Sequence, residues 1–140
     1  MPYFKDADEV YATIGKLFQD LADDEELAPK FRKANTIVRY EFRDPDSEIT
    51  LRLQEGQPGD VDFGESEMEP DVTMSMAADT AHRFWLGQVN VTVALARGQI
   101  KAKGPVAKIL KLVPLTKPVF ARYKAQLEAQ GRNDLVNVGQ

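Results

Sequence analysis

Apolar residues near the start of the chain recur at the spacing of an amphipathic helix. The stripe consists of Val10, Ile14, Leu17, Phe18 and Leu21. Intervals of three and four residues place such side chains on one helix face. Asp6 can cap this helix, because Glu9 follows three residues later as in a capping box. Acidic residues at 23–26 followed by basic residues at 30–33 predict a short second helix aligned with its dipole.

From residue 36 the period of the pattern changes to two. The apolar positions are Val38, Tyr40 and Phe42, then Ile49, Leu51 and Leu53. Polar residues alternate with them and the turn 44–47 separates the two runs. The pattern therefore predicts a β-hairpin with one buried and one solvated face. The alternation returns over 61–63 as a weaker strand and over 72–76 as a further strand.

The second half has a mainly helical pattern. Three helices are predicted, from Asp79 or Thr80 to Gly87, from Gly104-Pro105 to Pro114, and from Thr116 or Lys117 to Gly131. Residues 99–103 alternate like a strand. Residues 91–96 alternate too, but they follow Asn90, which can cap a helix, so periodicity leaves this segment open. We expect residues 132–140 to be disordered.

This order of elements predicts an α+β fold. Helices, antiparallel strands, helices, one late strand and further helices fit a half-solvated sheet with helices on its other face. No linker, repeat or low-complexity tract divides the sequence. We therefore expect one domain over residues 1–140.

Composition removes several classes of function. The 140 residues include no cysteine and one histidine. Disulfides, thiolate nucleophiles, iron–sulfur clusters and polyhistidine metal sites are therefore excluded. No apolar run approaches the roughly 18 residues that span a bilayer, and residues 1–6 are not a signal peptide, so we expect a cytoplasmic protein.

Charge is distributed unevenly along the chain. Residues 1–80 contain 20 acidic and 8 basic side chains, whereas residues 81–140 contain 2 and 10. A basic half is compatible with an anionic ligand, membrane headgroups or nucleic acid. We favour halves that interleave and neutralise each other, because lysines along amphipathic helices usually mark the solvated face. Nucleic acid is not an expected partner, since no stacking aromatic residues lie between the lysines.

Catalytic residue patterns are scarce. The single histidine, His82, has Asp79 nearby in sequence, but no second histidine and no Gly-x-Ser-x-Gly turn accompany it. We expect His82 to face solvent on its helix. The glycines of 56–64 lead into an acidic strand rather than a helix, which makes a poor phosphate site. The sequence therefore predicts no enzyme activity, no cofactor and no metal.

The second half also has a surplus of apolar side chains. Leu86 and Leu112 lie off the main apolar faces of their helices, so at least two sides of these segments are apolar. One interpretation is a filled core plus a homodimer contact. The other is a cavity between the helices and the sheet that holds an apolar ligand.

Three stretches in this half, in this order, carry a family resemblance. They are Pro70–Met76, Phe84–Gln88 and Arg97–Gly104, the last reading Arg-Gly-Gln-Ile-Lys-Ala-Lys-Gly. Together they resemble the sterol carrier protein-2 (SCP-2) domain, over roughly residues 6–128 and most closely over 70–113. The sequence does not end in a peroxisomal signal, and it is most similar to free-standing, bacterial-type members.

The resemblance implies a specific fold and activity. The fold would be a five-stranded, mostly antiparallel sheet with helices on one face and an apolar tunnel between them, and 91–97 would be helical. The implied activity is non-catalytic binding and transfer of sterols, fatty acids, fatty acyl-CoA or other lipids. From the inward phase of each element, our candidate ligand contacts are Met74, Met76, Phe84, Trp85, Val91, Leu95, Ile100, Ile109, Leu110, Val113 and Phe120.

Partners and rival functions follow from the same features. Lys101, Lys103, Lys108 and Lys111 could meet a ligand carboxylate or CoA phosphate, and a transient membrane contact is compatible with them. One alternative is a protein-interaction or dimerisation module with a filled core. Another is an accessory domain that presents lipid to a separate enzyme.

Overall fold

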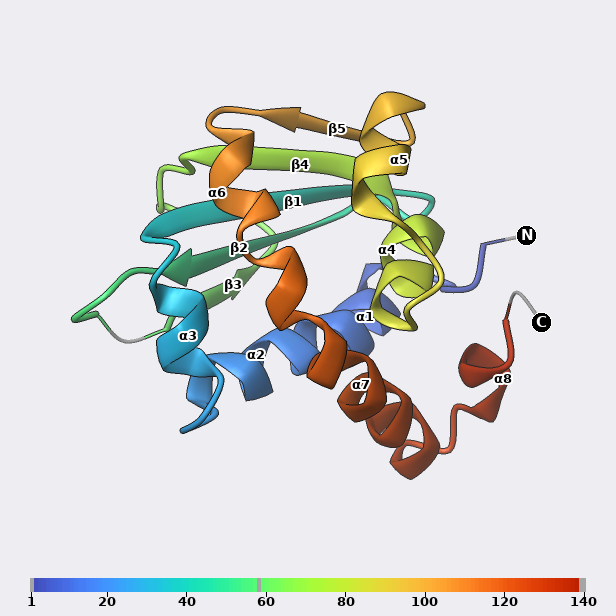
Figure 1. Ribbon diagram of the computed structural model, residues 1–140. Helices are drawn as coiled ribbons and strands as arrows, with labels where there is room; N and C mark the ends of the chain where they lie inside the picture. The colour runs from blue at the N-terminus through green and yellow to red at the C-terminus, as the bar shows by residue number, and fades with distance from the viewer. Residues whose placement is uncertain (1, 58, 139–140) are drawn as a thin grey trace.

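The computed structural model, which describes residues 2–57 and 59–138, is an α+β fold built on one sheet (Figure 1). Its strands are β1 (Thr36–Arg43), β2 (Ser47–Leu53), β3 (Val61–Phe63), β4 (Val72–Ala77) and β5 (Ile100–Lys103). They lie in the order β3-β2-β1-β4-β5. The pair β1–β4 is parallel and the other three pairs are antiparallel, as expected from the resemblance.

The first helix follows the predicted stripe, with its cap where expected. It comprises α1 (Ala7–Val10), a π-helical turn η1 (Tyr11–Gly15) and α2 (Lys16–Asp23), and α3 (Ala28–Arg32) follows it. The Asp6 carboxylate accepts a 3.0 Å hydrogen bond from the Glu9 backbone N–H. The Glu9 carboxylate accepts from the backbone N–H of Lys5, so both carboxylates satisfy N–H groups at this helix end.

Helices dominate the second half. They are α4 (Ala78–Trp85), α5 (Val91–Ala96), α6 (Val106–Leu110), the 3₁₀ turn η2 (Val113–Leu115), α7 (Lys117–Ala129) and α8 (Asn133–Val136). Segment 91–96 is helical, and the Asn90 side chain accepts a 3.1 Å hydrogen bond from the Val93 N–H. This cap stabilises the helical conformation of 91–96, which periodicity alone does not distinguish from a strand. Among the described residues, no helix combines the length and apolar character that crossing a bilayer requires.

The two faces of the sheet differ as the alternation predicts. The register places Tyr40 beside Ile49 and Met74, and Phe42 beside Met76, all on the helix-covered face. On the other face the Arg39 guanidinium lies 3.2 Å from the Glu48 carboxylate and donates to the Met68 carbonyl oxygen at 2.8 Å.

His82 corrects one prediction. Its side chain is fully buried rather than solvent-facing. Nε2 lies 2.8 Å from the Leu135 carbonyl oxygen and Nδ1 lies 2.8 Å from the Tyr123 hydroxyl. Because a carbonyl oxygen only accepts, Nε2 carries the proton and Nδ1 accepts from Tyr123. These partners lie 41 and 53 residues away along the chain, so local pattern could not reveal them.

The predicted disorder of residues 132–140 is contradicted over 133–136, and residues 139–140 lie outside the described residues. Residues 133–136 form α8, and the Leu135 side chain is 1% exposed. Both ends of the chain pack against or beside α4. The Tyr3 N–H donates to the Asp79 carboxylate, and Gln88 donates to the Val138 carbonyl oxygen.

Replacing Gly104 with alanine should destabilise the protein by about 3 kcal/mol. Gly104 has φ +100°, and a Cβ there would overlap the Asp71 carbonyl oxygen, which belongs to the backbone. Gly98 at the other end of β5 is the matched control, because its φ is +74° but a Cβ would meet nothing within 4 Å. Gly98→Ala should cost only about 1 kcal/mol. Urea denaturation measures both, and equal losses would contradict the steric explanation.

The stability should fall in acid because of His82. Burial lowers the pKa of His82 from its ordinary value of 6.5, although the Leu135 carbonyl and Asp79 oppose this. Below pH 6.5 the imidazole of His82 therefore binds a proton in the unfolded chain but stays neutral in the folded chain. The contribution of His82 to the free energy of unfolding is fully present above pH 6.5 and falls as the pH drops from 6.5 toward the folded pKa.

The His82→Gln variant isolates this effect, because carboxylate titration is common to both proteins. The loss in the wild type should exceed that in the variant by at most about 1.4 kcal/mol for each pH unit below 6.5. Chemical denaturation between pH 7 and 5 measures it. Parallel curves for the two proteins would show that His82 does not titrate on unfolding.

Candidate functional site

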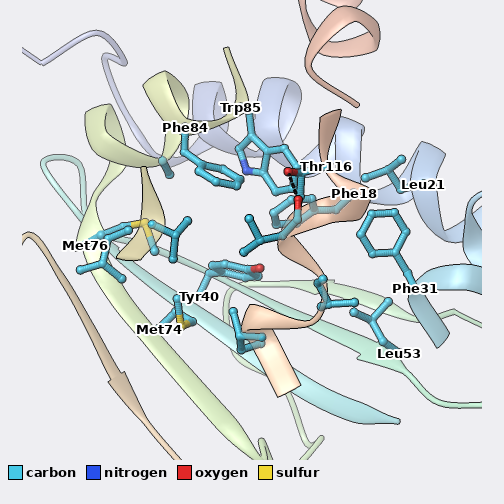
Figure 2. A pocket seen from close by; sticks show the side chains of 16 residues that line it. Phe18, Leu21, Phe31, Tyr40, Leu53, Met74, Met76, Phe84, Trp85 and Thr116 are labelled. Atoms are coloured by element: carbon cyan, nitrogen blue, oxygen red, sulfur yellow. Dashed lines mark hydrogen bonds between the residues drawn. The ribbon is translucent and has the colours of Figure 1, made fainter. Parts of the chain in front are cut away.

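An apolar cavity of about 70 Å³ lies between the inner face of the sheet and the helices (Figure 2). The strands supply its floor through Tyr40, Leu53, Met74, Met76 and Ile100. The cavity lies over β1 and β4 because Tyr40 and Met74 are paired in the parallel register. The site therefore sits at the centre of the sheet.

Helices from both halves of the chain form the walls. The wall residues are Phe18 and Leu21 of α2, Phe31 of α3, Ala81, Phe84 and Trp85 of α4, Val91 of α5, Ile109 of α6, and Leu112, Val113 and Thr116 at and beside η2. None of these side chains, nor of the floor residues, carries a charge. A charged group placed inside would lose its hydration without gaining a counter-charge.

Aromatic rings give the cavity its shape. Trp85 meets Phe84 edge-to-face at a centroid distance of 4.8 Å and Phe18 at 5.5 Å. Phe18 lies 5.2 Å from the ring of Tyr40, which joins the wall to the floor. Edge-to-face contacts hold such rings in fixed orientations.

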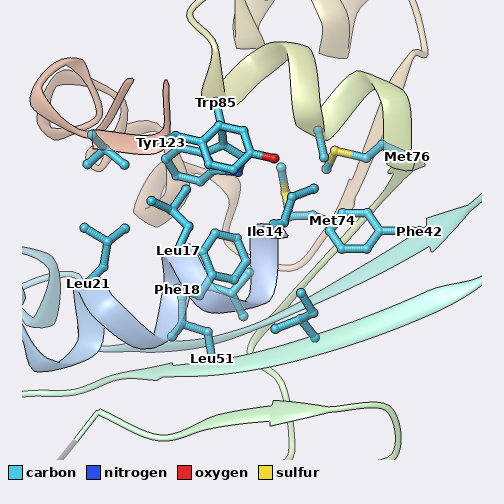
Figure 3. Close-up of a cluster of buried hydrophobic side chains, with 14 of the residues drawn as sticks. Ile14, Leu17, Phe18, Leu21, Phe42, Leu51, Met74, Met76, Trp85 and Tyr123 are labelled. Carbon is cyan, nitrogen blue, oxygen red and sulfur yellow. The ribbon is translucent and has the colours of Figure 1, made fainter. Parts of the chain in front are cut away.

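The core is closed where it adjoins this space. Figure 3 shows Ile14, Leu17 and Phe18 packed toward Tyr123 and the sheet, and Ile14 is fully buried. Phe18 and Trp85 belong both to this cluster and to the cavity wall. The cavity therefore shares two of its wall residues with the packed core beside it.

Two hydroxyl groups border the apolar space. Thr116 donates a 2.6 Å hydrogen bond to the Val113 carbonyl oxygen. The Tyr40 hydroxyl is drawn without a hydrogen bond to the other lining residues (Figure 2). Burial raises the pKa of Tyr40 to about 12, so its hydroxyl is neutral at physiological pH.

Most sequence-predicted contacts line the cavity, and three do not. The eight that line it are Met74, Met76, Phe84, Trp85, Val91, Ile100, Ile109 and Val113. Leu95, Leu110 and Phe120 lie outside the lining. Leu110 is 40% exposed because α6 ends there and the chain tightens into a 3₁₀ turn. Phe120 instead packs edge-to-face on Phe84 at 5.8 Å.

Eight lining residues were not among the predicted contacts. Five come from the first half of the chain, and the other three from the second: Phe18, Leu21, Phe31, Tyr40 and Leu53, then Ala81, Leu112 and Thr116. Periodicity placed Phe18, Leu21, Tyr40 and Leu53 on inward faces, but it cannot separate a residue against a filled core from one against a void.

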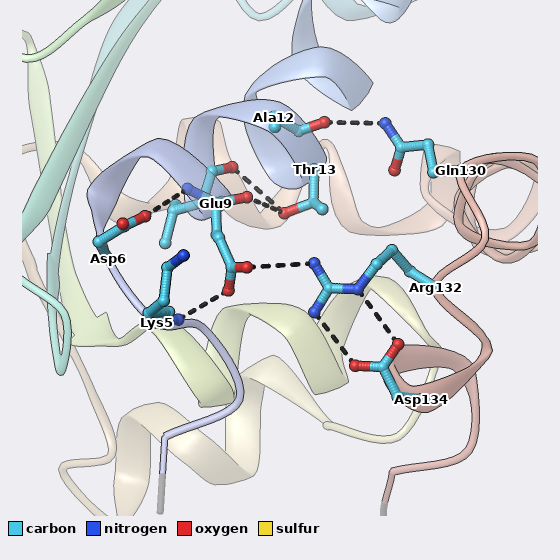
Figure 4. A network of polar contacts seen from close by, with 9 residues as sticks. Lys5, Asp6, Glu9, Ala12, Thr13, Gln130, Arg132 and Asp134 are labelled. Atoms are coloured by element: carbon cyan, nitrogen blue, oxygen red, sulfur yellow. Dashed lines mark hydrogen bonds and ion pairs between the residues drawn. The ribbon is translucent and has the colours of Figure 1, made fainter.

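A second depression, between residues 5–13 of the first helix region and Gln130 and Arg132 after α7, is polar (Figure 4). Arg132 bridges Glu9 at 3.4 Å and Asp134 at 3.1 Å, and the side chain of Gln130 donates to the Ala12 carbonyl oxygen. The Arg132 guanidinium holds the pKa of Asp134 below its usual range. The ion pair of Arg132 with Glu9 and the hydrogen bond of Gln130 to Ala12 tie the C-terminal segment to the first helix. Residues 2–57 and 59–138 contain no group of three His, Asp or Glu side chains able to hold a metal ion.

The rim of the cavity side is apolar and basic. Val93 on α5 is 44% exposed, and Leu110 on α6 is exposed to a similar extent. Lys111 follows α6 and is exposed, and the Lys108 ammonium donates to the Asn35 carbonyl oxygen at 3.2 Å. Lys101 and Lys103 are also exposed, but the register pairs them with Ser75 and Thr73, so they lie on the solvated face of the sheet and not on the cavity side.

Comparison with known families gives a match over most of the chain. A family model described as the SCP-2 sterol transfer family matches residues 14–117. "Hydroxysteroid dehydrogenase-like protein 2" of Mus musculus is 26% identical over 121 residues, which cover 86% of this chain and 23% of that protein. The chain spans less than a quarter of the length of the curated relatives it matches.

Solved structures share the fold. The sterol carrier protein domain 2 of Helicoverpa armigera superposes with a TM-score of 0.64 at 22% identity, covering 81% of this chain and 89% of that one. A structure titled "UbiJ-SCP2 Ubiquinone synthesis protein" superposes with a TM-score of 0.57 at 21% identity, covering 85% and 95%.

Proposed function

The chain belongs to the SCP-2 sterol transfer family, and we propose that it binds one apolar, lipid-like molecule in its cavity and carries it without chemical change. The observation that carries this proposal is the aromatic, uncharged lining at the centre of the fold. Ligand sites of this kind are concave and mostly apolar, with few polar groups. Sterol-like molecules, fatty acids and fatty acyl-CoA are the ligand classes under consideration.

Binding requires the cavity to enlarge. Its volume of about 70 Å³ is several-fold below the roughly 300–1,000 Å³ of typical ligand pockets. We infer that segment 106–115 moves to make this space. It consists of two short helical segments joined by Lys111 and Leu112, so its displacement disrupts few backbone hydrogen bonds. Its buried anchors into the cavity are Ile109 and Leu112. A ligand that replaced their contacts with its own surface would compensate for displacing them.

Charged ligand groups would remain at the rim. A carboxylate or a CoA phosphate can approach Lys111, which is exposed directly after α6, whereas Lys101 and Lys103 lie on the other face of the sheet. Exposed ion pairs of this kind contribute little each. Affinity would come from apolar surface removed from water, at about 25 cal/mol per Å² before association costs.

We also propose that the rim contacts an anionic membrane while the ligand enters or leaves. Val93 and Leu110 supply exposed apolar side chains on α5 and α6, the two helices that flank β5 in the chain (Figure 1). Arg97 directly after α5 and Lys111 directly after α6 are exposed and basic, so they are complementary to anionic headgroups. The apolar cavity would then open toward the phase in which its ligand dissolves.

The same exposed side chains favour a second candidate, a protein-interaction or dimerisation module. Exposed apolar groups of this kind also serve protein contacts. A third candidate is an accessory domain that delivers lipid to an enzyme. It is supported by relatives in which the matched part covers less than a quarter of the protein.

Native mass spectrometry of the purified protein, followed by organic extraction, separates these functions. A bound lipid at stoichiometric amount would support the carrier. An empty monomer that binds no lipid probe would overturn it, and an empty dimer would favour the interaction module.

Filling the cavity should abolish binding while leaving the fold intact. Ala81 lines the cavity and is 3% exposed, so Ala81→Leu adds carbon atoms into the space a ligand needs. The affinity for an NBD-labelled stearate should fall at least about tenfold. Fluorescence titration measures the affinity, and circular dichroism with thermal unfolding verifies the fold.

Ala121→Leu is the matched control for that substitution. Ala121 is exposed on α7, so the same change adds apolar bulk without entering the cavity. Its affinity should equal that of the wild type. A folded Ala81→Leu variant that keeps full affinity would place the ligand elsewhere.

Leu110→Glu should weaken membrane contact without affecting the cavity. The exposed leucine lies outside the lining, so probe affinity in solution should be unchanged. Co-sedimentation with phosphatidylserine-containing vesicles should fall about tenfold, because burial of the leucine is lost and a like charge is added. Ala121→Glu makes a comparable charge change on α7 and should have a smaller effect. Equal losses in the two variants would leave only a general charge effect and contradict docking through α6.

A further inference from the structure

Besides Thr116, whose hydroxyl donates to the Val113 carbonyl oxygen, the cavity lining contains two hydrogen-bond donors, Tyr40 on the floor and Trp85 on the wall. Figure 2 shows the Tyr40 hydroxyl and the Trp85 indole nitrogen directed toward the cavity. The figure marks a hydrogen bond between Thr116 and Val113, and none at Tyr40 or Trp85. Both groups therefore lie at the cavity with hydrogen-bonding capacity that the lining residues leave unused.

We propose that Tyr40 and Trp85 select a ligand that carries an uncharged oxygen, a ketone or hydroxyl group, inside the cavity. This proposal rests on the proposed function and specifies the ligand class for the same site. The indole N–H only donates and the phenol can donate, so the complementary ligand atom is an acceptor. A carbonyl oxygen, with two lone pairs, can accept from both.

The absence of charge in the lining excludes an ionised group at this position. The lining residues include no Lys, Arg or His, so nothing there would offset the lost hydration of a carboxylate. An ionised ligand would have to keep its head at the rim. An uncharged ketone or hydroxyl oxygen can instead be buried inside the cavity, because hydrogen bonds from the Tyr40 hydroxyl and the Trp85 indole N–H compensate for its lost hydration.

Rigidity of the two donors strengthens this selection. Trp85 is held edge-to-face between Phe84 and Phe18, and Tyr40 lies 6.0 Å from Phe42 in a stacked arrangement. Trp85 and Phe84 stand at an interplanar angle of 81°. Donors held in place before binding lose little freedom when a ligand accepts from them. Burial also keeps the Tyr40 hydroxyl protonated, since it raises the pKa of Tyr40 to about 12.

The test compares 2-decanone with decanoate, which have the same chain length, by displacement of a fluorescent apolar probe. Tyr40→Phe should weaken 2-decanone about two- to tenfold, the range expected for one neutral hydrogen bond, and leave decanoate unchanged. Trp85→Phe should act in the same direction on the ketone. Tyr11→Phe is the control, because the Tyr11 hydroxyl accepts from the Glu48 N–H and Tyr11 does not line the cavity.

A second readout comes from the single tryptophan of the chain. In the wild type, 2-decanone should shift the Trp85 emission further to the red than decane does, because only the ketone accepts from the indole. Equal effects of Tyr40→Phe on ketone and decanoate, or no effect on either, would overturn the selection while leaving apolar binding in place. If no probe, ketone or decanoate binds to the wild type, the proposed function itself fails.

Discussion

The parallel pairing of β1 with β4 is the constraint on which the rest of the structure depends. A parallel pair cannot be closed by a tight turn, so the chain must leave β1, form β2 and β3 on one side, and return on the other. The return over 64–71 is held against the solvated face, where Arg39 donates to the carbonyl oxygens of Ser66 and Met68. The helices that pack on the sheet lie on its opposite face, and the register brings Tyr40 from the first half beside Met74 from the second (Figure 1).

The sequence determines the elements more clearly than it determines the site. Alternation predicted the hairpin and β4 because one face of each strand is buried and the other is wet. The helical stripe predicted α2 for the same reason. The family resemblance supplied what periodicity could not, namely the helical state of 91–96, for which the local pattern fits a strand equally well.

The errors share a physical cause, which is that local pattern contains no information about distant partners. His82 appeared as a surface residue because Tyr123 and Leu135, which bury it, are remote in sequence. Leu110 shared a helical phase with Ile109 only as long as the helix continued, and α6 ends at that residue. Conversely, Phe18 and Tyr40 were recognised as inward without any sign that a void lay in front of them. Whether packing is complete depends on the sum of many side-chain volumes.

The attachment of both chain ends around α4 has a topological consequence. Tyr3 and Phe4 contact His82 through their rings, and the Leu135 carbonyl oxygen meets the other side of the same imidazole. The first and last described segments of the polypeptide therefore lie close together, and both contact α4. A short peptide joining the two ends would span little distance, and new termini opened at the turn 44–46, where Asp44 and Asp46 are exposed, would leave the order of strands in space unchanged. Circular permutation is therefore built into the geometry of this domain, and a neighbouring domain attached at either end would emerge from the same side of the molecule.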